Sequence, residues 1–385
     1  MNKKSFTIIK VLATILLVSF LAFKHVYWLA IGIVFITSFL FAYKVFETKI
    51  KRYKILNYSI IFIGIFFISI FLRLFFFELY TIPSDSMEDT IKIGDKVLAN
   101  KVIYGPQMPE SILEVPWLNI AYVLLSDNKP KEWKYSRIKG FAEPKTNDVI
   151  IFKAPWKKQN RQVFIKRCIG CPGDTICIKN SLVLVNHNQI DFPSHGKHNY
   201  NIYTASPDSI YKFLKKTGYQ LNEIKKECIT TSIDYITYLE LNKNVIIDSI
   251  TIDNTSGNYT RIAHPKIDSL GWTFANYGPV IVPYKGFTVK LDSFVAKLYR
   301  RPFNYFENIT IENTKDIWKV NGKISDTYTF TNNYYWMMGD NRPNSDDSRY
   351  WGFVSEECII GKANRILFSK NYEGFQWNRT FKKIQ

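Results

Sequence analysis

The chain has 385 residues, of which 46% are hydrophobic and 16% aromatic, and its formal net charge is +18. The chain has five cysteines, a small and odd number, which excludes a disulfide-rich protein whose fold depends on several disulfide bonds. A strong positive charge is typical of proteins that meet nucleic acid or an anionic membrane surface. The basic residues are scattered and some stand between apolar segments, so we expect a lipid bilayer as partner and no nucleic acid.

The first 80 residues contain three apolar runs, 5–23, 26–43 and 55–72. Each is close to the roughly 20 residues that a membrane-spanning helix needs. No small-residue cleavage site follows the first run, which argues against a cleaved signal peptide. Only two residues separate the first two runs, so these form a tight hairpin or lie partly in the interface. We predict a membrane anchor over residues 1–78 with two or three transmembrane helices.

The positive charges around these runs predict how the anchor is oriented. They precede the first run or crowd the loop before the third: Lys3, Lys4, Lys44, Lys49, Lys51, Arg52 and Lys54. Cytoplasmic loops carry such an excess of lysine and arginine. We therefore expect a multi-pass protein of the cytoplasmic membrane, with the N-terminus inside and everything after about residue 78 on the outer, periplasmic side.

We interpret residues 79–185 as the first part of the core of the soluble body and residues 331–385 as its second part. Residues 80–103 and 147–185 alternate apolar and polar positions and are rich in valine and isoleucine. Segments such as DVIIFKAP, QVFIKRCIG and SLVLVN are typical of strands separated by turns. Residues 104–146 interrupt this pattern with prolines, tryptophans and lysines, and we interpret them as an inserted surface segment. Within it, residues 112–125 form either a short helix or a stretch that rests on the bilayer.

Residues 186–330 are polar and rich in tyrosine, asparagine and lysine, and we interpret them as an inserted second domain. Within this domain, residues 209–218 are typical of a helix and residues 284–291 of a strand. Residues 331–385 return to a dense motif and end in one or two strands over 359–369. The predicted fold is mainly β, with N-terminal transmembrane helices followed by a β-rich body that carries insertions.

Two serines, Ser84 and Ser86, follow the membrane segment directly in the sequence IPSDSMEDT. A hydrolase that uses serine needs a base, which is usually a histidine held by a carboxylate. None of the five histidines accompanies a dense motif, and we interpret them as surface residues: His25, His187, His195, His198 and His264. The sequence therefore disfavours a Ser-His-Asp arrangement.

A lysine replaces histidine as the base when burial lowers its pKa. Lys166 stands in the apolar segment VFIKRCIG, and in an alternating strand it shares a face with Phe164. Most lysines in strands face solvent, so this pattern alone is weak. It gains weight from the motifs around it.

Three blocks together resemble the type I signal peptidases, or leader peptidases. They read IPSDSMEDTIKIGDKVLANK, NDVIIFKAP…VFIKRCIGCPGDTI and MMGDNRPNSDDSRYWGFV, and they cover about a fifth of the chain. The family consists of membrane serine proteases with a Ser/Lys dyad, which remove signal peptides at the outer face of the cytoplasmic membrane. The resemblance implies a signal-peptidase-like catalytic body and, as partners, precursor proteins that carry signal peptides.

Carried over residue by residue, the resemblance implies four catalytic or supporting groups. Ser86 is the nucleophile, and Lys166, neutral when active, is the general base. The Ser84 hydroxyl joins the Ser86 backbone N–H in holding the oxyanion. Ser345 orients the Lys166 ammonium by a hydrogen bond.

Four charged residues are implied to support the site structurally as two ion pairs, Asp347 with Arg349 and Asp340 with Arg167. Gly339 is expected to shape the turn beside them. Five further residues match the pocket positions of the family, where branched side chains restrict the substrate to small residues; packing in the core is the alternative for all five. They are Ile82, Pro83, Met87, Ile151 and Ile165.

The chain departs from the family pattern at two positions of the first block. Asp85 stands between the serines where glycine is common, and Asp89 stands where proline is often found. Neither change removes a catalytic group. Asp85 places a carboxylate beside the nucleophile, which is expected to alter substrate preference.

No metal and no cofactor are expected. Cys168 and Cys171 form a C-x-x-C pair, but no second pair follows at zinc spacing. The disulfide state stays open for all five cysteines, since the body is expected outside the cytoplasm: Cys168, Cys171, Cys177, Cys228 and Cys358.

The sequence leaves the substrate repertoire open between a general signal peptidase and a dedicated peptidase with few substrates. A catalytically silent, membrane-anchored binding module is disfavoured because Ser86 and Lys166 are both present. A self-cleaving repressor with a Ser/Lys dyad is disfavoured because it should carry a DNA-binding module and lack membrane spans. We expect a monomer.

Overall fold

The structure is a computed structural model. It describes residues 12–20, 30, 33–34, 36–38, 40–41, 43–44, 53–156, 162–219, 221–371 and 374–384. The described chain divides into two compact units. One comprises Met1–Glu78 and Ala99–Glu143, and the other comprises Leu79–Leu98 and Pro144–Gln385. The four-part domain division expected from the sequence stays a prediction.

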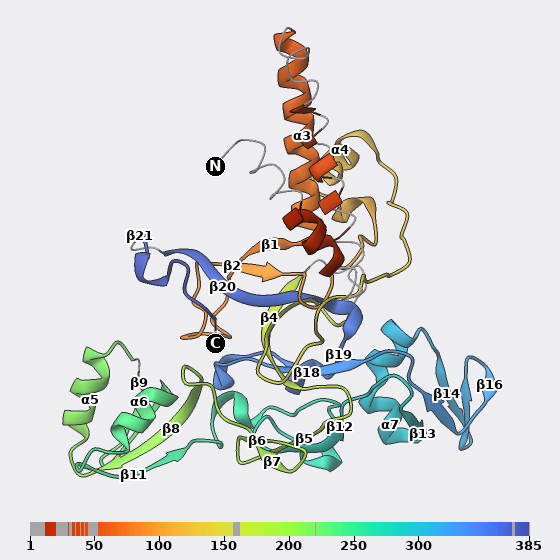
Figure 1. Cartoon of the computed structure of the whole chain (residues 1–385). Helices are drawn as coiled ribbons and strands as arrows, with labels where there is room; N and C mark the ends of the chain where they lie inside the picture. The colour runs from red at the N-terminus through yellow and green to blue at the C-terminus, as the bar shows by residue number, and fades with distance from the viewer. Residues whose placement is uncertain are drawn as a thin grey trace. The chain divides into compact units, whose positions relative to one another are not determined.

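The first unit contains one helix long and apolar enough to cross a membrane within the described residues. This helix, α3, covers Lys54–Phe75 and has no buried residue (Figure 1). At 1.5 Å per residue its 22 residues extend about 33 Å, close to the thickness of a hydrocarbon core. Near its end, Arg73 donates to Glu78 at 2.9 Å. The third predicted span is thus a helix with the length and composition of a membrane span.

The first two predicted spans lie largely outside the described residues. Residues 12–20 are helical, and so are the described positions between 30 and 44. Of the two alternatives for 112–125, the short helix is present. It forms η1, Ile112–Glu114, and α4, Leu118–Leu125, whose apolar side chains are mostly exposed.

The central element of the second unit is an eight-stranded sheet within the described residues, and its order is β1-β2-β20-β3-β4-β18-β19, with β21 paired to β20. The strands are β1 (Phe77–Thr81), β2 (Asp95–Asn100), β3 (Val149–Lys153), β4 (Val163–Gly170), β18 (Tyr334–Met338), β19 (Val354–Ser355), β20 (Ile359–Asn371) and β21 (Gly374–Phe375). Figure 1 shows β4, β18 and β20, which come from distant parts of the sequence, in this body. The predicted closing strand over 359–369 is confirmed as β20.

Strands β3, β4 and β18 are neighbours inside this sheet and are largely buried. All five residues of β18, YYWMM, are buried, as are the first four of β3, VIIF. A strand covered on both faces has an unbroken apolar sequence, which explains these runs. The second half of β4 is equally buried. The side chains of Lys166 and Arg167 point to opposite faces of the sheet, and both faces are covered, so both polar residues lie inside the body.

The region 186–330 contributes a second, four-stranded sheet in the order β11-β8-β10-β9. Its strands are β8 (Lys197–Thr204), β9 (Leu221–Ile224), β10 (Cys228–Asp234) and β11 (Ile247–Ile252). Two helices accompany it, α5 (Pro207–Lys216) and α6 (Tyr235–Leu241). Helix α5 buries Ile210 and Leu214, four residues apart on one face, against this sheet. The helix predicted at 209–218 is therefore confirmed.

Smaller sheets complete the unit. One has the order β12-β5-β6-β7, another pairs β13 with β17, and a third has the order β14-β15-β16. Their strands are β5 (Thr175–Lys179), β6 (Leu182–Val185), β7 (Asn188–Gln189), β12 (Tyr277–Ile281), β13 (Thr288–Lys290), β14 (Ile311–Thr314), β15 (Ile317–Val320), β16 (Lys323–Ile324) and β17 (Thr327–Thr329). The short helices are α7 (Ser293–Leu298), α8 (Ser348–Trp351), η2 (Gly257–Thr260), η3 (Asp268–Leu270), η4 (Pro302–Glu307), η5 (Arg342–Asn344), η6 (Glu356–Cys358) and η7 (Trp377–Arg379).

The strand predicted at 284–291 is shorter in the structure. Only β13, Thr288–Lys290, forms, because residues 284–287 make a turn in which the Phe287 N–H donates to the Tyr284 carbonyl at 2.9 Å. Gly286 has φ +92°, a conformation that glycine adopts readily. Gly286, between Lys285 and Phe287, marked a turn rather than a strand position.

Candidate active site

Ser86 lies in the turn between β1 and β2. The turn is closed at its base by two backbone hydrogen bonds, from the Ile82 N–H to the Asp95 carbonyl (3.0 Å) and from the Gly94 N–H to the Ile82 carbonyl (3.1 Å). The Ser86 carbonyl accepts from the Asn341 N–H at 3.1 Å. The half-buried Ser86 is therefore held both by its own turn and by the segment after β18.

Lys166 reaches this serine from β4. Its Nζ donates to the Ser86 Oγ, and the lysine side chain is only 2% exposed. In the ladder Lys166 pairs with Ile150 of β3, so apolar strands enclose it. Burial lowers the pKa of Lys166 from 10.5 to about 8, although Asp347 and Asp340 act in the opposite direction. A neutral lysine amine is therefore well populated at mildly alkaline pH.

Gly339 packs tightly between Ser86 and Ser345. A Cβ atom at this position would lie 2.5 Å from the Ser86 carbonyl oxygen and 2.2 Å from the Ser345 Oγ. Neither contact is tolerated, and one of them is to backbone. Only glycine at position 339 lets the segment after β18 approach the Ser86 turn this closely.

Ser345 lies in this cluster, but its hydroxyl makes no hydrogen bond in the structure. Its Oγ is buried and is without a partner among the described residues. The hydrogen bond to the Lys166 ammonium that the sequence predicts is thus not formed here. Since Ser345 and Ser86 both border Gly339, its supporting role stays a prediction.

Asp340 and Arg167 form one of the two predicted ion pairs. The guanidinium donates twice, from Nε to Oδ1 at 2.8 Å and from Nη2 to Oδ2 at 2.6 Å, and both residues are buried. Thr90, four residues after Ser86, donates to the same carboxylate at 2.7 Å. Asp340 thereby joins the Ser86 turn to β4.

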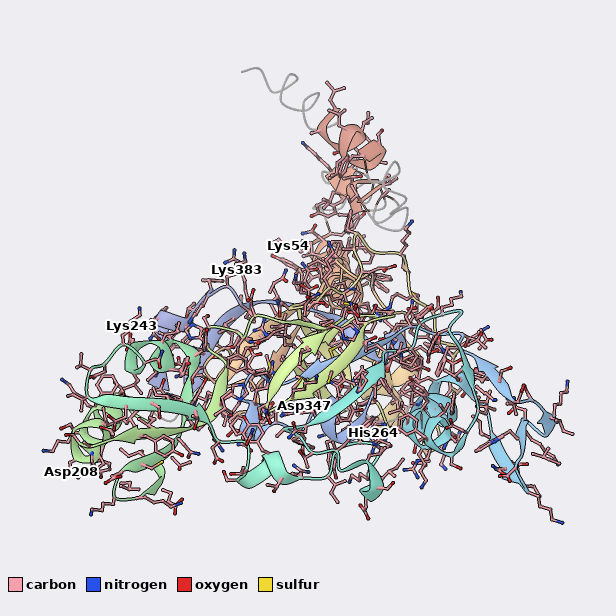
Figure 2. The ribbon with its side chains drawn as sticks, turned by 90° about the horizontal axis from the view of Figure 1, so that it is seen from below. Lys54, Asp208, Lys243, His264, Asp347 and Lys383 are labelled. Atoms are coloured by element: carbon pink, nitrogen blue, oxygen red, sulfur yellow. The ribbon has the colours of Figure 1, made fainter. Side chains whose placement is uncertain are left out.

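Asp347 and Arg349 form the other pair, also buried (Asp347 is labelled in Figure 2). The Arg349 Nε and Nη2 donate to the two Asp347 oxygens at 2.9 and 2.8 Å, and the Gly339 N–H donates to Oδ2 at 3.1 Å. Burial by itself would raise the pKa of Asp347, but the guanidinium and the N–H outweigh it and lower this pKa below its usual value. The carboxylate therefore stays ionised beside Lys166.

Asp85, which departs from the family pattern, has a partner. Its Oδ2 accepts from the Asn344 Nδ2 at 2.7 Å, and its backbone carbonyl accepts from the Asn341 Nδ2 at 3.1 Å. Sequence reasoning missed Asn344 and Thr90 as residues that hold the turn. Both are polar and stand inside the motif blocks, and this is the sequence signal by which they could have been found. At the second departure, Asp89 has φ +72°, which the ring of a proline excludes.

The remaining predicted residues differ in exposure. Ser84 and Pro83 are exposed and Ile165 is half-buried, so all three can meet a substrate. Ile82, Met87 and Ile151 are buried members of the hydrophobic core, the alternative considered for them. The pocket and oxyanion roles stay predictions.

Among the described residues, no histidine forms a hydrogen bond with Ser86 or Lys166, but two of the histidines are not surface residues. His198 and His264 are buried, and His264 Nε2 lies 2.8 Å from the Leu298 carbonyl. Burial lowers the pKa of His264 to about 4, so it is a neutral packing residue. The surface interpretation was wrong for these two because aromatic side chains surround them, as Phe192 and Tyr259 surround His198.

The described residues contain no group of His, Cys, Asp and Glu side chains arranged to hold a metal ion. All five cysteines are free thiols in the structure. The sulfur atoms of Cys168 and Cys171 lie 4.0 Å apart.

A sequence model of the family described as "Signal peptidase, peptidase S26" matches residues 55–244 and 285–368. The chain belongs to this family. Its blocks around Ser86, Lys166 and Asp347 all fall within the matched residues. The chain is accordingly a peptidase, and its β-rich fold is that of a family member.

Several named relatives are similar over most of the chain. Signal peptidase I of Buchnera aphidicola subsp. Baizongia pistaciae is 26% identical over 78% of this chain and 72% of its own length. Signal peptidase I of Aquifex aeolicus is 25% identical over 76% of both chains. A solved signal peptidase I from Enterococcus faecalis is 17% identical and covers 57% of this chain and 97% of its own, with a TM-score of 0.22.

Proposed function

We propose that this family member is a membrane-bound serine endopeptidase that removes N-terminal signal peptides from exported proteins. Ser86 is the nucleophile and Lys166 the general base. The observation that carries the proposal is the hydrogen bond from the buried Lys166 Nζ to the Ser86 Oγ. The names of the relatives, signal peptidase I, support the substrate class.

In the proposed first step, the neutral Lys166 amine takes the Ser86 hydroxyl proton as Oγ attacks the scissile carbonyl. The carbonyl oxygen becomes an oxyanion, which the Ser86 N–H and the exposed Ser84 hydroxyl stabilise. Lys166 then returns the proton to the leaving amine, and the C–N bond breaks. Water attacks the resulting acyl-enzyme by the same route, and the released signal peptide carries a new carboxyl end.

The proposed site faces the outer side of the cytoplasmic membrane. The charge pattern around the apolar runs supports this orientation. Along the chain, Ser86 follows the last residue of α3, Phe75, by eleven residues.

The first experiment compares cleavage of a purified precursor with an Ala-x-Ala site by the full chain in detergent. Lys166→Ala is expected to lose activity by at least 1,000-fold, because no other base replaces the amine. Lys212→Ala, a change at an exposed position of α5, is the matched control and should cleave like the wild type. Cleavage by Lys166→Ala at the wild-type rate would reject the lysine base, and failure of the folded wild type to cleave would reject the substrate class.

A further inference from the structure

Lys197, the first residue of β8, is attached by its backbone to the segment that holds Ser86. Its N–H donates to the Asp340 carbonyl at 2.8 Å, and the residue forms a parallel bridge with Asn341. Asn341 in turn donates its own N–H to the Ser86 carbonyl at 3.1 Å. The start of the second sheet is thus joined to the groups that hold the Ser86 turn.

The side chain of Lys197 contacts the Ser86 turn directly. Its Nζ donates to Glu88 Oε2 at 3.0 Å and lies 3.0 Å from Asp89 Oδ2. These two acidic residues follow Ser86 by two and three positions. One residue therefore connects β8 both to the Ser86 turn and to the segment after β18.

The Lys197 ammonium is largely shielded from water. Its side chain is 11% exposed, compared with 39% for Glu88 and 18% for Asp89. Burial by itself lowers the pKa of Lys197, but the two carboxylates outweigh it and raise this pKa above its usual value. Lys197 is therefore a cation at the pH of cleavage, whereas Lys166 is neutralised by its burial.

Lys197 is the buried cation of this contact. The other cation that the described residues bring to Asp89 is Lys92, whose Nζ lies 3.5 Å from Oδ1. The Lys92 side chain is 50% exposed, so water and salt screen its pair. Without Lys197, the carboxylates of Glu88 and Asp89 would lose their shared partner and repel each other in a half-buried turn.

Asp89 is also a position at which the chain departs from the family pattern, in which proline is often found. Proline would offer no charge to Lys197, and the φ of +72° at this position excludes its ring. The ion pair gives the departure a physical reason, because the carboxylate binds a lysine that comes from a distant segment of the chain.

We propose that Lys197 is a positioning residue for the cleavage reaction: its ammonium holds Glu88 and Asp89 together and thereby fixes the turn that carries Ser86. The second sheet supports the proposed nucleophile in this way, since Lys197 begins β8. This inference rests on the proposed function for its kinetic effect. A displacement of about 1 Å in a reacting group costs on the order of 100-fold in rate, so a lost anchor is measurable.

The first test measures kcat and KM for a purified precursor with the full chain in detergent. Lys197→Met should lower kcat at least tenfold and leave KM within about threefold, because the nucleophile moves while substrate still binds. Lys197→Arg keeps the charge and should stay within about threefold of the wild type. Lys225→Met removes an exposed ion pair with Glu223 on the same sheet and, as the matched control, should cleave like the wild type.

A triple variant separates the charge of Lys197 from the packing of its stem. Lys197→Met combined with Glu88→Gln and Asp89→Asn also removes the repelling carboxylates, and should recover kcat at least threefold over Lys197→Met. Asparagine suits the left-handed backbone of residue 89. Lost packing of the lysine stem would not be repaired in this way. Equal kcat in Lys197→Met and the wild type, or no recovery in the triple variant, would overturn the proposal.

Hydrogen exchange measures the turn without a substrate. The Glu88 N–H donates to the Asp85 carbonyl and the Ile91 N–H to the Met87 carbonyl, each at 2.8 Å. These amides should exchange at least fivefold faster in Lys197→Met, while those of β10 keep their rates. Faster exchange in a chain whose wild type cleaves no precursor would reject the proposed function and support the contact. Unchanged exchange beside normal cleavage would reject the positioning role.

A further variant keeps the test decisive if Lys197→Met does not fold. Glu88→Gln with Asp89→Asn removes both carboxylates at half-buried positions and leaves the lysine in place. Its kcat should fall at least threefold, and the same turn amides should exchange faster than in the wild type. Wild-type values for both measurements would overturn the proposal.

Discussion

Lys166 shows how its environment changes the chemistry of one residue. An exposed lysine would be protonated at neutral pH, whereas this one is buried in β4 and hydrogen-bonded to Ser86. Two carboxylates, Asp347 and Asp340, oppose the effect of burial without cancelling it. Each of these carboxylates forms an ion pair with an arginine, which weakens its electrostatic attraction for the protonated Lys166.

The pH dependence of cleavage follows from this balance. Only the neutral amine accepts the Ser86 proton, so kcat/KM should rise with pH and level off above the pKa of about 8. Below that pKa the rate should fall about tenfold per pH unit. The measurement is kcat/KM from pH 6 to 10 with one precursor peptide. A rate already at its plateau at pH 6 would contradict a lysine base.

The contact between Asp85 and Asn344 is testable as a pair. Each residue comes from a different block, and the side chains meet at 2.7 Å. Asp85→Ala and Asn344→Ala should each lower kcat/KM by less than about tenfold, because Asn341 still holds the backbone of the turn. The double variant should be no worse than the worse single one. Strictly additive losses would mean that the two side chains act independently.

At the scale of elements, the segment from Gly339 to Arg349 organises the site. It contributes Asp340 to β4, the Asn341 N–H to Ser86, and Asp347 to the Gly339 N–H. Buried ion pairs of this kind are costly when one partner is removed. These pairs give the charged residues of this block a structural reason to be buried.

The Gly339 contacts predict a sharp steric effect. Gly339→Ala brings a methyl group against the Ser86 carbonyl, which cannot move without shifting Ser86, the proposed nucleophile. We expect a loss of kcat of at least 100-fold with the fold retained. Gly322→Ala is a useful control, since its surroundings are open and its φ of +78° makes it the more strained backbone position. Activity should fall in the first variant and persist in the second.

The anchor makes a prediction about orientation. In intact spheroplasts, a membrane-impermeant thiol reagent should label Asp208→Cys, an exposed position at the start of α5, above the wild-type background (Figure 2). Lys51→Cys, in the loop predicted to be cytoplasmic, should be labelled only after permeabilisation. Labelling of Lys51→Cys in intact spheroplasts would reverse the orientation.

At the scale of the whole molecule, the buried histidines link stability to pH. His264 has a pKa of about 4 in the folded chain and 6.5 as its ordinary value. Between these values the unfolded chain binds the additional proton, so stability is full above pH 6.5 and is lost as pH falls toward 4. The loss amounts to about 3 kcal/mol at 1.36 kcal/mol per pKa unit.

His264→Gln tests this linkage, because glutamine keeps a donor for the Leu298 carbonyl and does not titrate. The Tm of the full chain in detergent should fall less between pH 6.5 and 4 in the variant than in the wild type. His187→Gln, at an exposed position, serves as the control and should match the wild type. Equal slopes for His264→Gln and the wild type would exclude this histidine as the source.

The amino-acid sequence by itself determined the apolar helix at Lys54–Phe75, the β-rich body and the three blocks that carry Ser86 and Lys166. These features depend on composition, periodicity and local motifs, which are read along one stretch of chain. The tertiary structure decided which residues meet. It buried His198 and His264, gave Asp85 its partner and left the Ser345 hydroxyl unbonded. The burial and the hydrogen-bond partners of these side chains depend on segments that are distant in the sequence, so a local sequence pattern does not predict them.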